Sequence, residues 1–81
     1  MKAHFTKLIK AGNKLREFNF RKLASATHNL YHVDISDDRG NRIIFKVQKE
    51  DNGQWKIINQ ELPQWIFEVE PSLHSAIEEE V

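Results

Sequence analysis

The stretch Asn41-Arg42-Ile43-Ile44-Phe45-Lys46-Val47-Gln48-Lys49 decides the fold of this chain. Apolar and polar residues alternate along it, which is the pattern of a β-strand with one buried face. Turn signals bound it on both sides: residues 37–41 read Asp-Asp-Arg-Gly-Asn, and residues 50–53 read Glu-Asp-Asn-Gly. Asn-Gly between two alternating segments is typical of a tight hairpin connection. The side chains expected to point into the core are Ile43, Phe45 and Val47.

Strand patterns flank this central stretch on both sides. Residues 30–36 alternate between apolar and polar side chains, and so do residues 54–59. Because the connecting loops are short, neighbouring strands must run antiparallel. The inward residues expected in these two strands are Tyr31, Val33, Ile35, Trp55 and Ile57.

The N-terminal segment, residues 4–23, leaves two interpretations open for its first part. Apolar spacing would fit a short helix over residues 4–10, whereas alternation would make the same residues a strand. We favour the strand, because Gly12 and Asn13 accept positive φ and can close a hairpin. In the second strand of this hairpin the leucines and phenylalanines differ in parity, which we interpret as a bulge. Its inward residues should be Phe18 and Phe20.

The C-terminal segment, residues 63–79, has the apolar spacing of an amphipathic helix. Pro71 lies inside it, where proline removes a backbone donor and crowds the preceding turn, so we expect a helix kinked or broken at Pro71. Residues 78–80 are three glutamates, which oppose the helix dipole and should make the end fray. The apolar stripe consists of Leu62, Ile66, Val69, Leu73 and Ile77.

These elements predict an α+β fold in one domain. We expect an antiparallel four- or five-stranded β-meander with a C-terminal amphipathic helix packed on one face, since an apolar helix stripe needs a sheet to cover. The 81 residues divide into an N-terminal hairpin (4–23), a central meander (30–59) and the helix (63–79). A chain this short has a thin core, so oligomerisation is an expected source of further stability.

The chain contains no cysteine, which excludes disulfides and thiolate zinc sites and fits a reducing cytoplasm. The first residues lack the apolar run of a signal peptide. No segment approaches the roughly 20 apolar residues that a membrane helix needs. We therefore expect a cytoplasmic protein that does not act in a membrane.

Net charge is zero, but the charges are unevenly distributed along the chain. Residues 1–22 carry seven Lys or Arg and one acid, while residues 61–81 carry six acids and no Lys or Arg. A basic first quarter can be a nucleic-acid-binding surface. The simpler interpretation, which we favour, is that it lies near the acidic tail within one molecule or across a dimer.

No residue pattern indicates catalysis. His28 and His32 are four residues apart, but they span a loop and a strand start, and no third ligand stands in register with them. Asp34, Asp37 and Asp38 could hold a hard cation, yet the chain lacks the glycine and terminal glutamate of a calcium loop, and turn chemistry explains them. Phosphate loops and nucleophile elbows are absent. We predict a non-enzymatic domain without metal or cofactor.

Two surfaces are candidates for binding. The sheet face turned away from the helix mixes apolar and basic side chains, which suits a dimer interface or a single-stranded nucleic acid. The back of the helix carries Phe67 off the apolar stripe, to be covered by the N-terminal hairpin or by a partner chain. Our leading hypothesis is self-association or binding of a protein partner, motivated by Ile44, Ile58 and Phe67. The alternative is single-stranded nucleic-acid binding through Arg16, Arg42, Lys46 and Lys56.

Two resemblances accompany these patterns. The segments Arg16-Glu17-Phe18-Asn19-Phe20-Arg21 and Asp51-Asn52-Gly53-Gln54-Trp55-Lys56-Ile57 resemble small uncharacterised bacterial domains of the Bacteroidales kind, which implies no activity. Antiparallel strands followed by a helix that opens with Leu62-Pro63-Gln64-Trp65-Ile66 are similar in topology to the single-stranded-DNA-binding transcriptional coactivator domain. That resemblance implies a dimer that binds single strands on basic, aromatic-bearing sheet surfaces. This chain departs from the pattern in its neutral charge and shorter loops.

Overall fold

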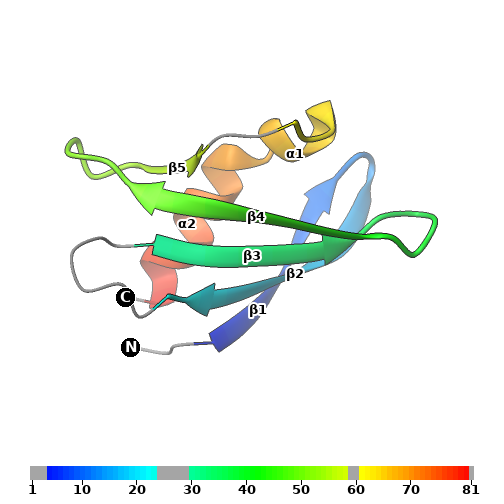
Figure 1. Cartoon of the computed structure of the whole chain (residues 1–81), viewed down its shortest axis with the longest axis horizontal. Coiled ribbons are helices and arrows are strands. Elements are labelled where there is room, and N and C mark those ends of the chain that lie inside the picture. Colours follow the sequence, from blue (N-terminus) through cyan, green and yellow to red (C-terminus); the bar gives the residue numbers. More distant parts are fainter. Residues whose placement is uncertain (1–3, 24–29, 59–60, 81) are drawn as a thin grey trace.

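The computed structural model describes residues 4–23, 30–58 and 61–80. One five-stranded antiparallel sheet follows the chain order β1-β2-β3-β4-β5, and two helices come after it (Figure 1). The predicted α+β class and the antiparallel meander are therefore confirmed, with five strands. The elements are β1 (His4–Ala11), β2 (Lys14–Lys22), β3 (Leu30–Ser36), β4 (Arg42–Lys49), β5 (Trp55–Ile58), α1 (Gln64–Phe67) and α2 (Glu70–Glu80).

The first segment is a strand, as we favoured, and its hairpin turn is two residues long. Gly12 and Asn13 have φ values of 63° and 71°, the left-handed pair that such a turn requires. The predicted bulge is wrong, because β1 and β2 pair one to one without interruption. Leu15 differs in parity from the phenylalanines simply because its side chain points outward, where it is 65% exposed.

The core lies on the inner face of the sheet. All inward residues that the alternation predicted belong to the core or pack against it. Tyr31, Val33 and Val47 are fully buried, and the Tyr31 ring meets Trp55 edge to face at 5.2 Å between centroids. Each large side chain buried in this way contributes about 1.5–3 kcal/mol to folding.

The helical segment is not continuous. α1 ends at Phe67 and α2 begins at Glu70, so the interruption precedes Pro71, which occupies the first turn of α2, where a missing N–H is tolerated. The apolar stripe is buried from Ile66 onward and joins the core cluster of the sheet. Among the helices that the structure describes, none is long and apolar enough to cross a membrane.

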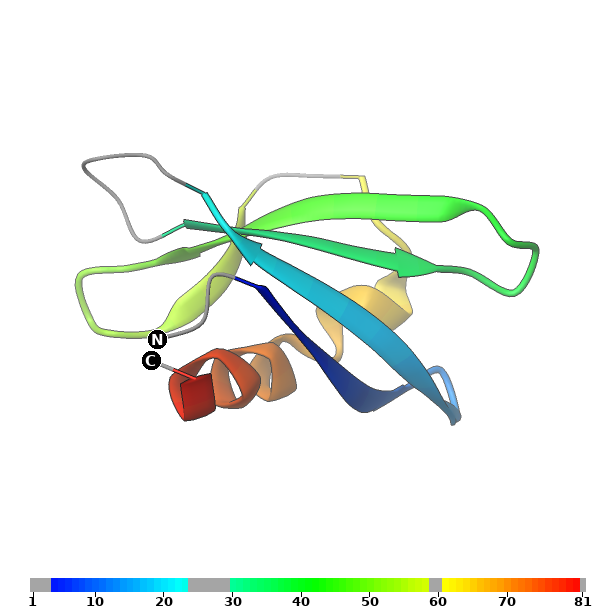
Figure 2. The same cartoon turned by 90° about the horizontal axis from the view of Figure 1, so that it is seen from below.

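The predicted fraying of the acidic end is wrong, since α2 extends to Glu80. Tertiary partners outweigh the unfavourable dipole there. Lys7 of β1 lies 3.0 Å from Glu79 and 3.1 Å from Glu80, and the indole Nε1–H of Trp55 donates to Glu78 over 2.8 Å. Figure 2 shows α2 on the inner side of the sheet, below β1.

The hairpin connections follow the predicted turn chemistry. Asp37 Oδ1 accepts the backbone N–H groups of Arg39 and Asn41, and Gly40 has a φ of 82°. These bonds lower the pKa of Asp37, chiefly through the Asn41 N–H. Two of the three aspartates are thus part of the turn, as expected.

Candidate binding surface

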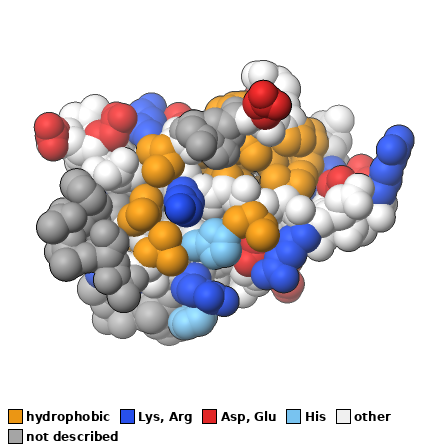
Figure 3. Space-filling model, viewed as in Figure 1, with side chains coloured by type: hydrophobic (Ala, Val, Ile, Leu, Met, Phe, Trp, Pro, Cys, Tyr) orange, Lys and Arg blue, Asp and Glu red, His pale blue; other side chains and the backbone are white. Residues whose placement is uncertain are grey.

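The outer face of the sheet consists of the side chains at even positions of β1, β3, β4 and β5 and at odd positions of β2. These side chains alternate with the buried ones in every strand. The register of the strands decides which of them become neighbours. This surface is the candidate binding site, and Figure 3 views it from the front.

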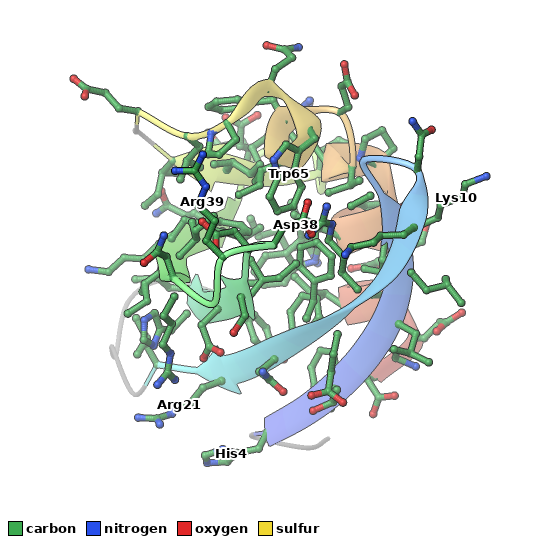
Figure 4. The ribbon with its side chains drawn as sticks, turned by 90° about the vertical axis from the view of Figure 1, so that its right-hand side faces the viewer. His4, Lys10, Arg21, Asp38, Arg39 and Trp65 are labelled. Carbon is green, nitrogen blue, oxygen red and sulfur yellow. The ribbon has the colours of Figure 1, made fainter. Side chains whose placement is uncertain are left out.

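A row of basic and histidine side chains crosses the outer face. His4 of β1 is opposite Arg21 of β2, Arg21 is opposite His32 of β3, and His32 is opposite Lys46 of β4. We call these four residues the basic row. Figure 4 shows His4 and Arg21 side by side at one end of the sheet. Neither Arg21 nor Lys46 has an ion-pair partner among the described residues.

The row concentrates positive charge on the outer face. Arg21 and Lys46 lie on the two sides of His32, on strands β2 and β4. Complementary charge attracts a partner to such a surface. An anionic group placed over the row would therefore be attracted by both cations.

Apolar side chains border the basic row. Ile44 is 51% exposed, and Leu30 and Ile58 are half-buried on the same face. Ile58 extends the row itself, opposite Lys46 on β5. Figure 3 shows hydrophobic side chains gathered beside the basic and histidine ones. The surface therefore offers both charge and apolar area.

Polar side chains in a second row across this face form hydrogen bonds with one another. Thr6 Oγ1 donates to Asn19 Oδ1 over 2.8 Å, and Asn19 Nδ2 donates to Asp34 Oδ1 over 3.1 Å. Arg42 completes the chain by donating to Asp34 Oδ2 over 3.1 Å. Both carboxylate oxygens of Asp34 are engaged, and so is Arg42, which sequence reasoning offered as a free binding residue.

Arg16 does not belong to this surface, contrary to the nucleic-acid hypothesis. Its side chain points inward and is 7% exposed. The guanidinium stacks on Trp65 at 4.3 Å, Nε–H donates to the carbonyl of Ala11 over 2.8 Å, and Nη1–H donates to Asp38 over 3.1 Å. β2 pairs with β3 only from Asn19 onward, and Arg16 lies in the diverging part, where it joins the hairpin to α1.

Asp38 forms ion pairs with two basic side chains of β2. Lys14 Nζ lies 2.7 Å from its Oδ1 and Arg16 Nη1 lies 3.1 Å from the same atom. These two partners, Lys14 first, hold the pKa of Asp38 below its usual value. Figure 4 shows Asp38 close to Trp65 on the side of the molecule that faces the viewer. Asp38 thus has a structural role, and the three aspartates do not form a cation site.

The other predicted binding residues divide between two surfaces. Lys46 and Ile44 lie on the outer face, as expected, and Ile58 lies there half-buried. Lys56 reaches Glu70 of α2 at 3.3 Å, so its charge is partly neutralised. Phe67 is on α1, 37% exposed, and is not part of the outer face. His28 lies outside the described residues.

Charge is segregated between the two sides of the molecule. α2 carries four of the six glutamates of residues 61–81, and neither helix carries a Lys or Arg; the other two, Glu61 and Glu68, lie outside the helices. Lys7, the basic residue that meets this acidic end, has its pKa raised by hydrogen bonds to Glu79 and Glu80. The expected contact between the basic first quarter and the acidic tail is therefore present within one chain.

Sequence reasoning missed two members of the basic row, His4 and Arg21. Arg21 has no motif around it, and alternation alone places it outward without showing which side chains it meets. The pairing with His32 depends on the register between β2 and β3. Within the described residues, no group of three His, Asp or Glu side chains is arranged to hold a metal ion.

Comparison with protein-family models, with curated proteins and with solved structures found no match to this chain. The two resemblances drawn from the sequence therefore stay predictions, and the argument for function rests on the surface itself.

Proposed function

We propose that this domain is a non-enzymatic binding module whose outer face binds an acidic protein surface. The observation that carries the proposal is the basic row, in which Arg21 and Lys46 stand without an ion-pair partner among the described residues. Complementary charge accelerates association and selects the partner. Glu78, Glu79 and Glu80 of α2 contact Trp55 and Lys7 on the inner side of the sheet, so these three carboxylates do not compete with the partner.

Apolar contacts would supply the affinity. Ile44 is 51% exposed beside the basic row, and burying such a side chain gives about 25 cal/mol per Å² of apolar surface. If α2 packs only on the inner face of the sheet, the outer face stays open to a partner. The combination of a central apolar anchor and surrounding polar groups is the usual composition of a protein interface.

The same charges argue against a second copy of this chain on the outer face. Two such faces packed together would bring Arg21 and Lys46 of one copy against basic residues of the other. Like-charge contacts of this kind disfavour a complex by several kcal/mol. We therefore assign the outer face to a different protein with acidic residues near an apolar group.

Single-stranded nucleic acid is the second candidate ligand, because the basic row could follow a phosphate backbone. It is also what the similarity to the coactivator domain implies. However, single-strand binding relies on aromatic rings that stack on the bases. All eight Phe, Tyr and Trp residues lie on the inner side of the sheet or on α1, so the outer face offers no ring. A protein partner fits this face better.

An NMR titration of the ¹⁵N-labelled chain tests the proposal. The probes are a peptide of alternating glutamate and leucine and a short oligothymidylate, each added at low salt. We expect the peptide to shift amide signals of β2, β3 and β4 and to lose affinity as salt rises. Lys46→Glu should abolish these shifts, whereas Arg39→Glu, an equal change of charge in the exposed β3–β4 loop, should preserve them.

Three results would decide against the protein partner. The proposal fails if the peptide causes no shift at low salt, or if Lys46→Glu and Arg39→Glu weaken binding equally. Tighter binding of the oligothymidylate, lost in Lys46→Glu, would replace it with the nucleic-acid function.

A further inference from the structure

The sheet has two edge strands, β1 and β5, and they differ in exposure. The edge of β5 is closed by α2. The backbone N–H of Trp55 donates to His74 Nδ1 over 3.2 Å, and the N–H of Ile57 donates to Glu70 Oε2 over 2.9 Å. Glu70 and His74 are one helical turn apart, so one side of α2 covers the outward donors of β5. No further strand can pair there without displacing these side chains.

The edge of β1 is open. The pair that flanks the two-residue turn, Ala11 and Lys14, exchanges both backbone hydrogen bonds in a hairpin of this type, and bonded and non-bonded pairs alternate from there. Thr6, Leu8 and Lys10 therefore point their N–H and C=O groups away from β2. No described residue makes a hydrogen bond to these outward groups. Such an edge is a template for another strand.

The side chains along this edge favour contact rather than solvation. Leu8 is 65% exposed on the outer face, next to the edge. On the inner side, a groove of about 440 Å³ runs between β1 and α2, lined by residues that include Ile9, Pro71 and Ala76. Lys7 also lines it, but Glu79 and Glu80 neutralise this lysine. Charge therefore does not close the groove to an incoming strand.

We propose that β1 pairs antiparallel with β1 of a second copy of this chain, about a two-fold axis at Leu8. In this register the bonded pairs are Leu8 with Leu8 of the second copy, and Thr6 with Lys10 of the second copy in both directions. The backbone N–H and C=O groups that point outward from β1 of one copy pair with the same groups of the other copy. One strand pairing therefore satisfies the hydrogen-bonding groups of both edges.

Apolar contact selects this register over the neighbouring one with the axis at Lys7. With the axis at Leu8, Lys7 is opposite Ile9 of the second copy and Lys10 is opposite Thr6. Shifting the axis to Lys7 would place each Leu8 opposite Thr6 of the second copy and separate the two leucines. The register at Leu8 instead brings the exposed leucines together, so their apolar surface leaves water.

The pairing itself does not depend on the proposed function, but its consequence for binding rests on that function. Antiparallel strands related by a two-fold axis belong to one sheet, so both outer faces lie on the same side. The two basic rows would then share one continuous surface. A partner with two matching acidic segments would bind both copies and gain avidity.

Single-cysteine variants test the pairing, because the chain has no cysteine of its own. In Leu8→Cys the two copies would place their Cα atoms about 5.5 Å apart, which a disulfide can span. Leu15→Cys is the matched control: Leu15 is equally exposed, at 65%, on the same face but on β2. After mild oxidation we expect a linked dimer with Leu8→Cys and at least tenfold less with Leu15→Cys, both with native circular dichroism.

Sedimentation of the unmodified chain completes the test. We expect a monomer–dimer equilibrium whose dissociation constant rises at least tenfold in Leu8→Asp, and remains unchanged in Leu15→Asp. A strict monomer at the highest soluble concentration would overturn the proposal, even if that monomer binds an extended peptide at β1. Equal cross-linking of the two cysteine variants, or a dimer indifferent to Leu8→Asp, would overturn it as well.

Discussion

Replacement of Arg16 by alanine is the most informative perturbation of this fold. Sequence patterns present Arg16 as a free cation in a basic segment, but the structure buries it between the N-terminal hairpin, the β3–β4 loop and α1. If this placement is right, Arg16→Ala must lower the free energy of unfolding. A surface arginine would show almost no effect.

The magnitude follows from the contacts of the guanidinium. Its hydrogen bond to the buried carbonyl of Ala11 is charge-assisted, and loss of such a bond costs about 1.5–3 kcal/mol. Stacking on Trp65 at 4.3 Å contributes about 0.5–2 kcal/mol. Asp38 is 63% exposed, so this ion pair adds little. We expect a loss of about 3 kcal/mol, a large part of the roughly 4–12 kcal/mol available to a domain of this length.

Urea unfolding followed by tryptophan fluorescence measures this loss. Arg16→Lys is a milder variant, since lysine keeps the charge but cannot donate to the carbonyl and stack on the ring together; we expect a loss of about 1–2 kcal/mol. The matched control is Arg21→Ala on the outer face, where the change should stay within about 0.5 kcal/mol. A loss below about 1 kcal/mol for Arg16→Ala, or equal losses for the two alanine variants, would refute the buried placement.

Three further predictions concern stability. Tyr31→Phe should leave the urea midpoint at pH 7 unchanged or raise it, because the buried hydroxyl has no hydrogen-bond partner; a loss above about 1 kcal/mol would contradict this. Burial also raises the pKa of Tyr31, so the wild type should lose stability above about pH 10, where an unfolded tyrosine ionises first, and Tyr31→Phe should lose less. The pKa of Asp37 is lowered mainly by the Asn41 N–H, so its contribution is complete above the ordinary value of 3.8 and disappears as pH falls through the lowered value. Asp37→Asn should therefore flatten the acid side of the stability profile, and an unchanged profile would contradict the turn. Glu70→Ala should cost about 1–2 kcal/mol, because it leaves the N–H of Ile57 unpaired, and should increase concentration-dependent association at β5, measured by light scattering.

Much of the fold could be predicted from local pattern. Alternation assigned the inward side chains of β3, β4 and β5 and the two inward phenylalanines of β2, and the Gly-Asn, Asp-Asp-Arg-Gly-Asn and Asn-Gly segments located the turns. These features depend only on the side-chain period of a strand and on which residues accept positive φ. The α+β class followed, because an apolar helix stripe must cover a sheet.

The candidate site needed more than local pattern. Whether Arg21 meets His32 is a matter of register between strands separated by a connection, and no periodicity within either strand contains it. Parity in β2 puts Arg16 on the face of Phe18 and Phe20 and Arg21 on the opposite face, but it does not show that Trp65 and Asp38 lie against the Arg16 guanidinium.

The sequence by itself determined the strands, their turns and the sides on which apolar residues lie, because these properties are set by neighbours a few residues away. Only the tertiary structure decided which charges are free. Lys7, Arg16 and Lys56 meet carboxylates 14 or more residues away, and Arg42 meets Asp34 of the neighbouring strand, whereas Arg21 and Lys46 have no ion-pair partner in the part of the chain that the structure describes. A charge is neutralised by what lies within a few ångströms of it, and for these residues that distance is set by the packing of the sheet and helices rather than by the order of residues.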